Sequence, residues 1–282
     1  MCNKYLRIVP TLGVRIVHDF LHHFKKRAKH PERYPWEERW AKAQKTLRSL
    51  NRHFHLDIRV EGLEHYEALE KEGKKALLVG NHTSFLDPLI LISFLNNPIL
   101  LVGKKEVETM PFVGVAFKSI GGIFMDREDL KQSLKIILQC SSTLKKNEAS
   151  VLIFPEGTRN KDPENTLPAD FHAGTFKAAT RVGAPIIPIA MWGNFRGLKT
   201  KPDYKSLPIS IVFGEPITEE QYKDLSSEEL ASKVREWTIS QIERLKKFDK
   251  EYFEKGEQKI PLRKRKRDVF VRYDFDKREE IL

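Results

Sequence analysis

Short apolar segments recur between residues 56 and 213, and stretches with helical spacing separate them. Short runs rich in Ile, Leu and Val are typical of buried strands, whereas apolar residues three or four apart are typical of helices. The pattern predicts strands at 56–60, 75–80, 99–103, 122–125, 150–154, 185–191 and 209–213. It predicts helices at 63–71, 89–95, 112–117, 129–146, 171–182 and 219–252. This alternation indicates an α/β fold, with a central, mostly parallel or mixed sheet flanked by helices.

The first 55 residues have helical spacing without intervening strands. One helix is predicted over 9–29, with basic residues and histidines on one face and apolar residues on the other. Pro31 and Pro35 end it, and a second helix begins near Trp36. Together they form an antiparallel hairpin. Its apolar stripes either pack on the main domain or enter a membrane interface, where the basic side chains would meet lipid phosphates.

The positive charge of the chain lies mostly at its two ends. The net charge is +11; residues 1–60 carry fourteen Lys or Arg against five Asp or Glu, and residues 255–282 carry ten against six. We expect 255–282 to be a charged, irregular tail, although its basic run at 263–267 also fits a localisation signal or a nucleic-acid arm. Nothing else in the sequence resembles a nucleic-acid-binding motif, so we expect no nucleic-acid partner.

Several site classes are not indicated by the sequence. Cys2 and Cys140 are too few and too far apart for a disulfide framework or a thiolate metal cluster, and we expect no metal. The most apolar window, 85–102, is interrupted by Asp87-Pro88 and by Asn96-Asn97-Pro98. It therefore predicts a helix, a turn and a strand rather than a transmembrane helix, which needs about 20 mostly apolar residues.

One histidine follows a predicted strand closely and has a carboxylate nearby. His82 comes directly after the strand at 75–80, and Asp87-Pro88 then opens the next helix. Asp before Pro is a common helix N-cap, and we expect Asp87 to serve as one. Its second oxygen would then hold the His82 tautomer and leave the other ring nitrogen free to accept a proton. Asn81 and Ser84 are candidates for supporting this turn.

Cationic residues lie at the ends of three other predicted strands. Lys105 follows the strand at 99–103, Arg127 follows 122–125, and Arg159 follows 150–154 through the turn that contains Glu156, Gly157 and Thr158. Ligands of open α/β sheets bind beyond the carboxyl ends of the strands. Arg can bind phosphate through two parallel hydrogen bonds, and Lys binds it as a point charge. These positions therefore predict a phosphate pocket beside His82.

Four ordered segments resemble the motif blocks of the glycerolipid acyltransferase family, in particular the bacterial-type 1-acylglycerol-3-phosphate acyltransferases. They are Asn-His-x-Ser-x-x-Asp at 81–87, the Gly-x-Ile-Phe-x-x-Arg block ending at Arg127, Phe-Pro-Glu-Gly-Thr-Arg at 154–159, and the Pro-flanked strand at 185–188. The resemblance covers about residues 56–215. The chain departs from the family pattern at Asn160, where Ser is frequent, and at His172, where Lys is common.

The resemblance implies that an acyl chain passes from an acyl carrier protein or coenzyme A thioester to the sn-2 hydroxyl of lysophosphatidic acid, giving phosphatidic acid. His82 would be the base and Asp87 its orienting residue. Lys105, Arg127 and Arg159 would hold the phosphate, and Glu156, Gly157 and Thr158 would complete the substrate site. Glu156 would either accept a hydrogen bond from the glycerol or brace the turn. The thioester is a co-substrate, and no cofactor is expected. Another acceptor, such as glycerol-3-phosphate or a different lysophospholipid, and a catalytically idle lipid-binding protein remain alternatives.

Helical spacing, the motif blocks and the charge distribution together predict three parts of the chain. Residues 1–55 would be an amphipathic two-helix membrane-binding element, 56–254 the α/β catalytic domain and 255–282 the charged tail. With a lipid substrate implied, the membrane reading of the hairpin is favoured. The protein is then expected to be a monotopic or peripheral protein that contacts the phospholipid surface at the cytoplasmic face of the membrane.

Overall fold

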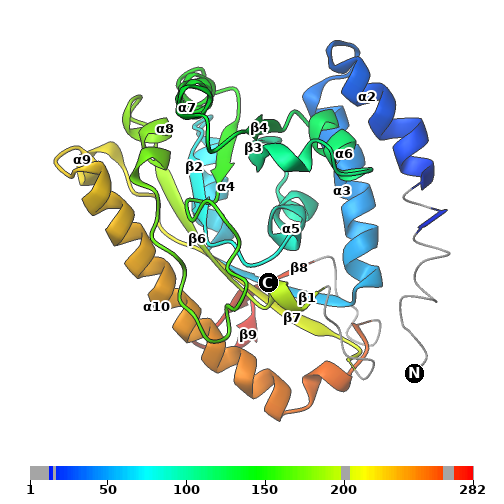
Figure 1. Ribbon diagram of the computed structural model, residues 1–282. Helices are drawn as coiled ribbons and strands as arrows, with labels where there is room; N and C mark the ends of the chain where they lie inside the picture. The colour runs from blue at the N-terminus through cyan, green and yellow to red at the C-terminus, as the bar shows by residue number, and fades with distance from the viewer. Residues whose placement is uncertain (1–12, 15–16, 198–203, 263–269, 282) are drawn as a thin grey trace.

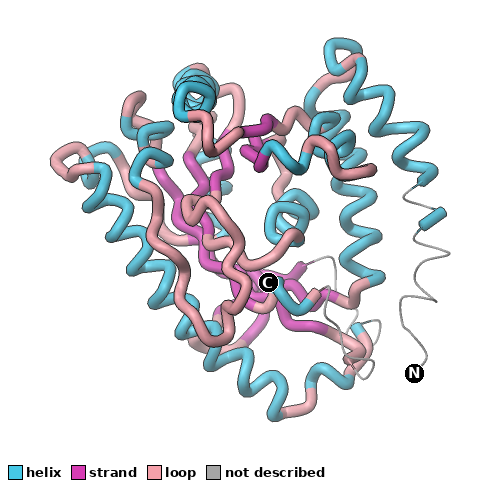
Figure 2. Tube along the Cα trace, viewed as in Figure 1, coloured by secondary structure: helices cyan, strands magenta, loops and turns pink. Residues whose placement is uncertain are grey.

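The computed structural model describes residues 13–14, 17–197, 204–262 and 270–281. Within them, nine strands form one sheet in the order β4-β3-β5-β2-β6-β7-β1-β8-β9, and helices cover both of its faces (Figure 1). The strands are β1 Leu56–Glu61, β2 Leu77–Gly80, β3 Ile99–Lys104, β4 Ile123–Met125, β5 Ser150–Ile153, β6 Ile186–Trp192, β7 Leu207–Phe213, β8 Phe270–Asp274 and β9 Glu279–Glu280. Figure 2 shows them as a continuous band between the helices.

The sheet is mixed, and its two directions divide it at β6 and β7. Neighbouring strands from β4 through β3, β5 and β2 to β6 are parallel. β7 runs antiparallel to β6, and β1 and β8 follow the direction of β7. The carboxyl ends of β2, β3, β4, β5 and β6 therefore lie at one edge. The predicted α/β fold with a mostly parallel or mixed sheet is confirmed.

Alternate side chains of the central strands enter two separate cores. Leu77 and Val79 of β2 face one core, and Leu78 between them faces the other, which is the period of two expected for a strand. α3, α4, α5 and α6 lie over the Leu78 face, and α7, α8 and α10 lie over the opposite face. The helices are α2 Lys25–Lys29, α3 Trp36–His53, α4 Leu63–Lys71, α5 Leu86–Phe94, α6 Val113–Ser119, α7 Leu130–Lys145, α8 Lys177–Thr180, α9 Glu219–Tyr222 and α10 Ser227–Glu254.

The helix predicted over 219–252 is divided into α9 and α10. Thr218 and Ser226 each form a capping box, in which the side chain of the cap and that of the third helical residue bond each other's backbone N–H groups. Two such start signals within nine residues begin two helices. The long α10 then lies along one flank of the sheet (Figure 1).

The irregular tail expected from residue 255 was wrong for residues 270–280, which form β8 and β9 at the edge of the sheet. Tyr273 and Phe275 are buried against Phe248 of α10. The guanidinium of Arg59 lies 4.9 Å from the centre of the Tyr273 ring. The spacing of the aromatic residues in this segment favours a strand, but the many charged residues around them made the segment look like an irregular tail. The basic run 263–267 lies outside the described residues.

The N-terminal segment forms the predicted hairpin, to the extent that it is described; residues 1–12 and 15–16 lie outside the description. A short 3-10 helix at Pro31–Arg33 separates its arms, and α3 begins after Pro35. The arms are antiparallel, because the hydroxyl of Thr46 donates to Asp19 and Arg27 pairs with Glu38 nearer the bend.

α3 belongs to the core of the domain. Trp40 is 1% exposed, and its Nε1 donates to the Leu95 carbonyl at 2.9 Å. The Gln44 side chain donates to the same carbonyl, and Arg48 Nε donates to that of Ser93. The last turn of α5 leaves carbonyls without helical partners, and α3 supplies donors to them. Packing on the main domain therefore accounts for this arm of the hairpin.

None of the described helices combines the length and the apolar character needed to cross a bilayer. Window 85–102 is divided into α5, a turn and β3, as its interruptions predicted.

Candidate active site

The loop after β2 is attached to the neighbouring strand β6 by one side chain. Asn81 is buried, and its Nδ2 donates to the Met191 carbonyl at 3.0 Å while its Oδ1 accepts from the Met191 N–H at 2.8 Å. The amide of Asn81 thus replaces a peptide unit of the sheet at the point where β2 ends. This pair of hydrogen bonds holds the start of the loop, and with it His82, at the carboxyl edge of the sheet.

His82 and Asp87 form the pair expected from the sequence. His82 Nδ1 lies 2.8 Å from Asp87 Oδ2, and the same oxygen accepts from the N–H groups of Thr83 at 2.7 Å and Ser84 at 2.8 Å. Asp87 is fully buried, whereas the His82 side chain is 17% exposed. Because an ionised carboxylate can only accept, Nδ1 carries the hydrogen and Nε2 is left as the basic nitrogen.

The expectation that Asp87 caps α5 was wrong. The helix begins at Leu86, so Asp87 is its second residue, and its side chain turns back to the amides of the preceding loop. Ser84 Oγ instead accepts from the Leu86 N–H at 3.1 Å. Asp87 Oδ1 is buried and has no hydrogen-bond partner within the described part of the chain. The carboxylate is therefore committed to the loop that carries His82.

The ring of His82 is also held by an aromatic side chain. Phe154 stacks on it with ring centroids 4.3 Å apart and an angle of 15° between the planes. Phe154 follows β5, the strand next to β2. In the sequence, Phe154 was predicted only as the end of a strand and had no expected part in the site. Its position in the same block as Glu156 was the available signal.

Glu156 is a buried carboxylate that holds two loops of the site together. It is 4% exposed, and its two oxygens accept from the N–H groups of His82 at 2.6 Å and Ala169 at 3.1 Å. Burial raises the pKa of this carboxyl, and the two N–H groups oppose that shift. With both oxygens bonded to the backbone, Glu156 links the loop after β5 to the loop after β2.

Gly157 lies where three segments meet. Its φ is +69°, and a Cβ atom there would lie 2.9 Å from His172 Nε2 and 3.8 Å from Arg127 Nη1. Glycine is favoured in this backbone region, and here a side chain would also enter occupied space. Arg127 is half-buried, its Nε has no partner among the described residues, and burial lowers its pKa. The structure thus brings His172, a departure from the family pattern, into the site.

The other predicted cations are exposed. Lys105 forms an ion pair with Asp126 at 3.0 Å, and the hydrogen bond to that carboxylate raises its pKa. Thr158 and Arg159 are exposed, and the N–H of the following residue, Asn160, donates to the His82 carbonyl at 2.7 Å. This hydrogen bond, one residue after Arg159, joins the motif after β5 to the motif after β2.

Comparison with known proteins identifies the same region. Residues 57–192 match the model of the acyltransferase family. The 1-acyl-sn-glycerol-3-phosphate acyltransferase of Haemophilus influenzae is 36% identical over 121 residues, which cover 43% of this chain and 49% of that protein. The enzyme of the same name from Escherichia coli is 29% identical over 172 residues, covering 61% and 69%. The chain spans about half the length of the first relatives that it matches.

A solved structure shares the fold over most of the chain. The crystal structure of the 1-acyl-sn-glycerophosphate (LPA) acyltransferase PlsC from Thermotoga maritima superposes with a TM-score of 0.59 and 21% sequence identity, covering 86% of this chain and 93% of that one. The match at 57–192 contains His82, Asp87, Arg127, Glu156 and Arg159 in the order that the motifs predicted. Residues 57–192, just under half of this chain, are therefore similar to the acyltransferase family.

Proposed function

We propose that this protein is a 1-acylglycerol-3-phosphate O-acyltransferase. It transfers a fatty acyl chain from an acyl carrier protein or coenzyme A thioester to the sn-2 hydroxyl of 1-acylglycerol-3-phosphate, and the product is phosphatidic acid. The observation that carries the proposal is the His82–Asp87 pair. A buried carboxylate holds Nδ1 at 2.8 Å, while the ring retains access to solvent. The relatives named above carry this activity in their names.

In this mechanism Nε2 of His82 removes the proton from the acceptor hydroxyl as the oxygen attacks the thioester carbonyl. Asp87 stabilises the imidazolium that forms, because its carboxylate stays beside the protonated ring. When the C–S bond breaks, the same proton passes to the leaving thiolate, so the acid and the base are one residue. A positioned acid–base residue contributes about 10²–10⁴-fold in rate. Phe154 and Glu156 hold the ring and its loop in place for this step.

The acceptor phosphate would be held beside the turn at Gly157, where Arg127 lies and where Arg159 follows two residues later, with Lys105 as the third candidate. Arg127 is the strongest candidate, because it is half-buried and its Nε has no partner within the described residues. A phosphate would supply the acceptors that this guanidinium lacks and would offset the cost of its burial. Lys105 would have to exchange Asp126 for the phosphate. Thr158 and Arg159 would close the site from the exposed side of the turn.

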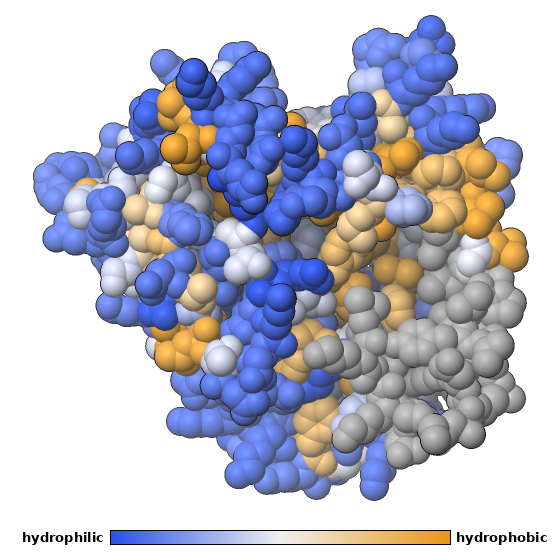
Figure 3. Space-filling view, in the orientation of Figure 1, coloured by the Kyte–Doolittle hydropathy of each residue, from blue (hydrophilic) through white to orange (hydrophobic). Residues whose placement is uncertain are grey.

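The acceptor is a lipid, so we also propose that the hairpin places the enzyme on the cytoplasmic face of a phospholipid membrane. The exposed apolar side chains Val14, Val17, Leu21, Met110 and Phe112 come from the first arm and from the segment before α6, and Phe20 contacts Phe112. Figure 3 shows apolar side chains gathered on this side of the molecule, below α2 and beside α6. A patch of this kind fits insertion at the boundary between headgroups and acyl chains.

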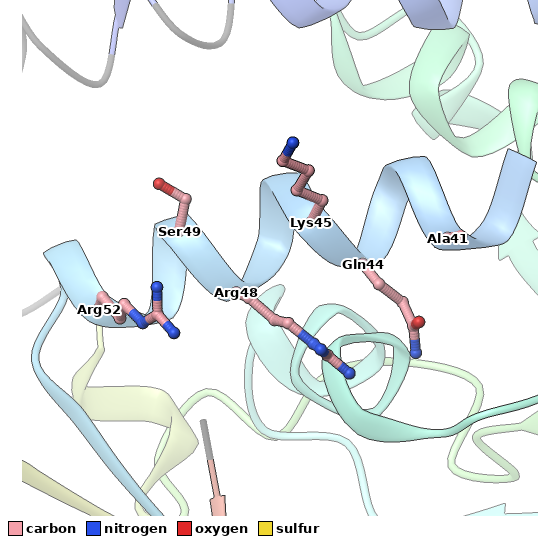
Figure 4. A pocket seen from close by; sticks show the side chains of 6 residues that line it. All are labelled: Ala41, Gln44, Lys45, Arg48, Ser49 and Arg52. Carbon is pink, nitrogen blue, oxygen red and sulfur yellow. The ribbon is translucent and has the colours of Figure 1, made fainter. Parts of the chain in front are cut away.

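The outer side of α3 offers a basic surface for lipid headgroups. A groove of about 450 Å³ is lined by Ala41, Gln44, Lys45, Arg48, Ser49 and Arg52 (Figure 4). Lys45 and Ser49 point away from α5, whereas Arg48 and Gln44 point toward it. Lys45 is therefore the clearest candidate for a headgroup contact, worth about 1 kcal/mol at an anionic surface.

A thiol-release assay tests the catalytic proposal. The full chain is incubated with acyl-coenzyme A or with acyl carrier protein thioester, and lysophosphatidate, glycerol-3-phosphate or another lysophospholipid is supplied as acceptor. We expect acceptor-dependent thiol release with lysophosphatidate and its loss in His82→Ala. Release with another acceptor alone would reassign the substrate. Binding of lipid without thiol release from either donor would identify a catalytically idle protein.

The membrane proposal needs point variants, because deleting α3 would remove Trp40 from the core. Leu21→Asp combined with Phe112→Asp should reduce co-sedimentation with vesicles that contain anionic phospholipid. Leu130→Asp serves as the matched control, since Leu130 is 82% exposed and begins α7 on the other face of the sheet. If the control reduces binding as much as the double variant, the patch is not the docking surface.

A further inference from the structure

Three potential metal ligands converge in the first arm of the hairpin, away from the His82 site. A ring nitrogen of His18, a carboxylate oxygen of Asp19 and a ring nitrogen of His23 all lie within 4.8 Å of one another. His18 Nδ1 and Asp19 Oδ1 are 3.3 Å apart. Ligand atoms about 2.0–2.1 Å from a tetrahedral zinc ion lie roughly 3.4 Å from each other, so this pair already has the required spacing. The ring nitrogen of His23 lies within 4.8 Å of both atoms and would have to move closer to complete the site.

The local backbone explains why the sequence did not predict this cluster. In an α-helix, side chains five residues apart point about 140° away from each other, because each residue turns about 100°. Phe20–Phe24 form a π-helix instead, and the Lys25 N–H bonds the Phe20 carbonyl five residues earlier. This wider turn places His18 and His23 on one side of the helix. Single π-turns inside α-helices occur frequently at functional sites.

The carboxylate of the cluster is oriented from the other arm. Asp19 is 5% exposed, and its Oδ2 accepts from Thr46 Oγ1 of α3 at 2.6 Å. Its Oδ1 is the atom that faces His18. Metal-binding carboxylates are commonly held by such a second hydrogen bond, which determines the oxygen that faces the ion.

Charged groups of both signs act on the cluster. Asp19 is the anionic member, and the positive neighbours of His23 are Lys42 and Arg27. Arg27 is paired with Glu38, which offsets its charge. Lys42 therefore makes the main unfavourable contribution.

We infer that His18, Asp19 and His23 bind a divalent transition metal of the zinc class, with water completing the coordination. Two imidazoles and one carboxylate suit zinc, copper and nickel rather than magnesium or calcium. Three protein ligands leave one tetrahedral position for solvent. The ion would join ligands across one turn of the first arm, and Asp19 would connect it to α3 through Thr46. This segment also carries Val17 and Leu21 of the apolar patch, so binding would stiffen the proposed docking surface.

The test uses the full chain without a histidine tag, in detergent micelles, after chelator treatment and buffer exchange. Zn²⁺ is titrated by calorimetry, and Co²⁺ is titrated by visible absorption, which reports tetrahedral nitrogen and oxygen ligands. We expect one equivalent bound with both ions. His18→Ala and His23→Ala should each abolish the saturable signal, and Thr46→Val should weaken affinity about 10–100-fold. Lys42→Gln should tighten it.

The matched control is His30→Ala, because His30 lies in the same hairpin but faces Glu32. It should bind both metals as the unaltered chain does. Thermal melting without metal identifies any variant whose loss of binding reflects unfolding. Full binding by His23→Ala, or equal loss in His30→Ala, would overturn the site and leave an ordinary hydrogen bond between His18 and Asp19. Thiol release is measured separately, so the catalytic proposal stands or fails independently.

Discussion

The most informative perturbation is Asp87→Asn, because one oxygen of this carboxylate accepts hydrogen bonds from three N–H groups. Bonds to a charged acceptor contribute about 1.5–3 kcal/mol each and neutral bonds about 0.5–1.5, so three bonds lose roughly 3 kcal/mol. The new amide group would occupy the position of Oδ1, where no described group can accept from it, at a further cost of about 1–3 kcal/mol. Removing a buried charge recovers part of its desolvation cost, so we expect a net destabilisation of about 2–4 kcal/mol.

The effect on catalysis should be separable from this loss of stability. The asparagine oxygen can still accept from Nδ1 and keep the tautomer, but it cannot stabilise the imidazolium. In a Ser-His-Asp triad the corresponding change lowers kcat about 10⁴-fold because the histidine takes the wrong tautomer. Here the N–H groups of Thr83 and Ser84 keep the oxygen toward Nδ1, so we expect a loss within the about 10²–10⁴-fold contribution of a positioned acid–base residue, with a small change in KM. Thiol release is measured at saturating lysophosphatidate, well below the melting temperature of the variant.

A destabilised control distinguishes chemistry from folding. Asp249 on α10 is also buried, and its two oxygens accept from Arg196 at 2.7 and 2.6 Å. Breaking a buried pair costs about 3–5 kcal/mol, so Asp249→Asn should be at least as destabilised as Asp87→Asn. It should nevertheless retain kcat, because it does not contact the His82 loop. The assigned role of Asp87 is refuted if both variants lose activity in proportion to their melting temperatures, or if Asp87→Asn keeps its kcat.

Three further predictions concern the rest of the site. Gly157→Ala should lose about 1 kcal/mol or more of unfolding free energy by urea titration and raise the KM for lysophosphatidate, because φ is +69° and the methyl group would approach His172; a neutral effect on both would show that the turn adapts freely. Arg159→Ala should raise the acceptor KM much more than the donor KM, and equal changes in both would remove Arg159 from the phosphate site. Glu156→Gln should be destabilised by about 1–3 kcal/mol, because its NH₂ group would face a backbone N–H that the carboxylate accepts. Burial raises the pKa of Glu156, so folding favours its protonated form. The stability that this protonated carboxyl contributes is fully present below its pKa in the unfolded chain, and it is lost as pH rises through its pKa in the folded chain. The unaltered chain should therefore exceed Glu156→Gln in unfolding free energy by less as the pH rises, as followed by urea titration between pH 4 and pH 7. A difference that grows with pH would contradict the assigned effect of burial.

Local sequence was sufficient for the elements and for the order of the motifs. Apolar runs of strand length were recognisable because parallel strands are buried on both faces, and the seven strands predicted between residues 56 and 213 were all found. β8 and β9 were missed because charged residues of both signs are frequent in residues 270–281, although Tyr273 and Phe275 are buried. The Asp87 cap was misplaced because a capping signal specifies the residue type and not the direction in which the side chain turns.

The sequence alone determined the chemistry available to this protein: one histidine and one carboxylate at the end of a strand, and cations at the ends of its neighbours. Tertiary structure decided which of these groups cooperate. Parallel pairing of β2 with β5 brought Phe154 and Glu156 onto the His82 loop, and the turn at Gly157 lies beside both Arg127 and His172. Such contacts join residues more than seventy positions apart or depend on one unusual backbone turn, and local spacing carries no record of either.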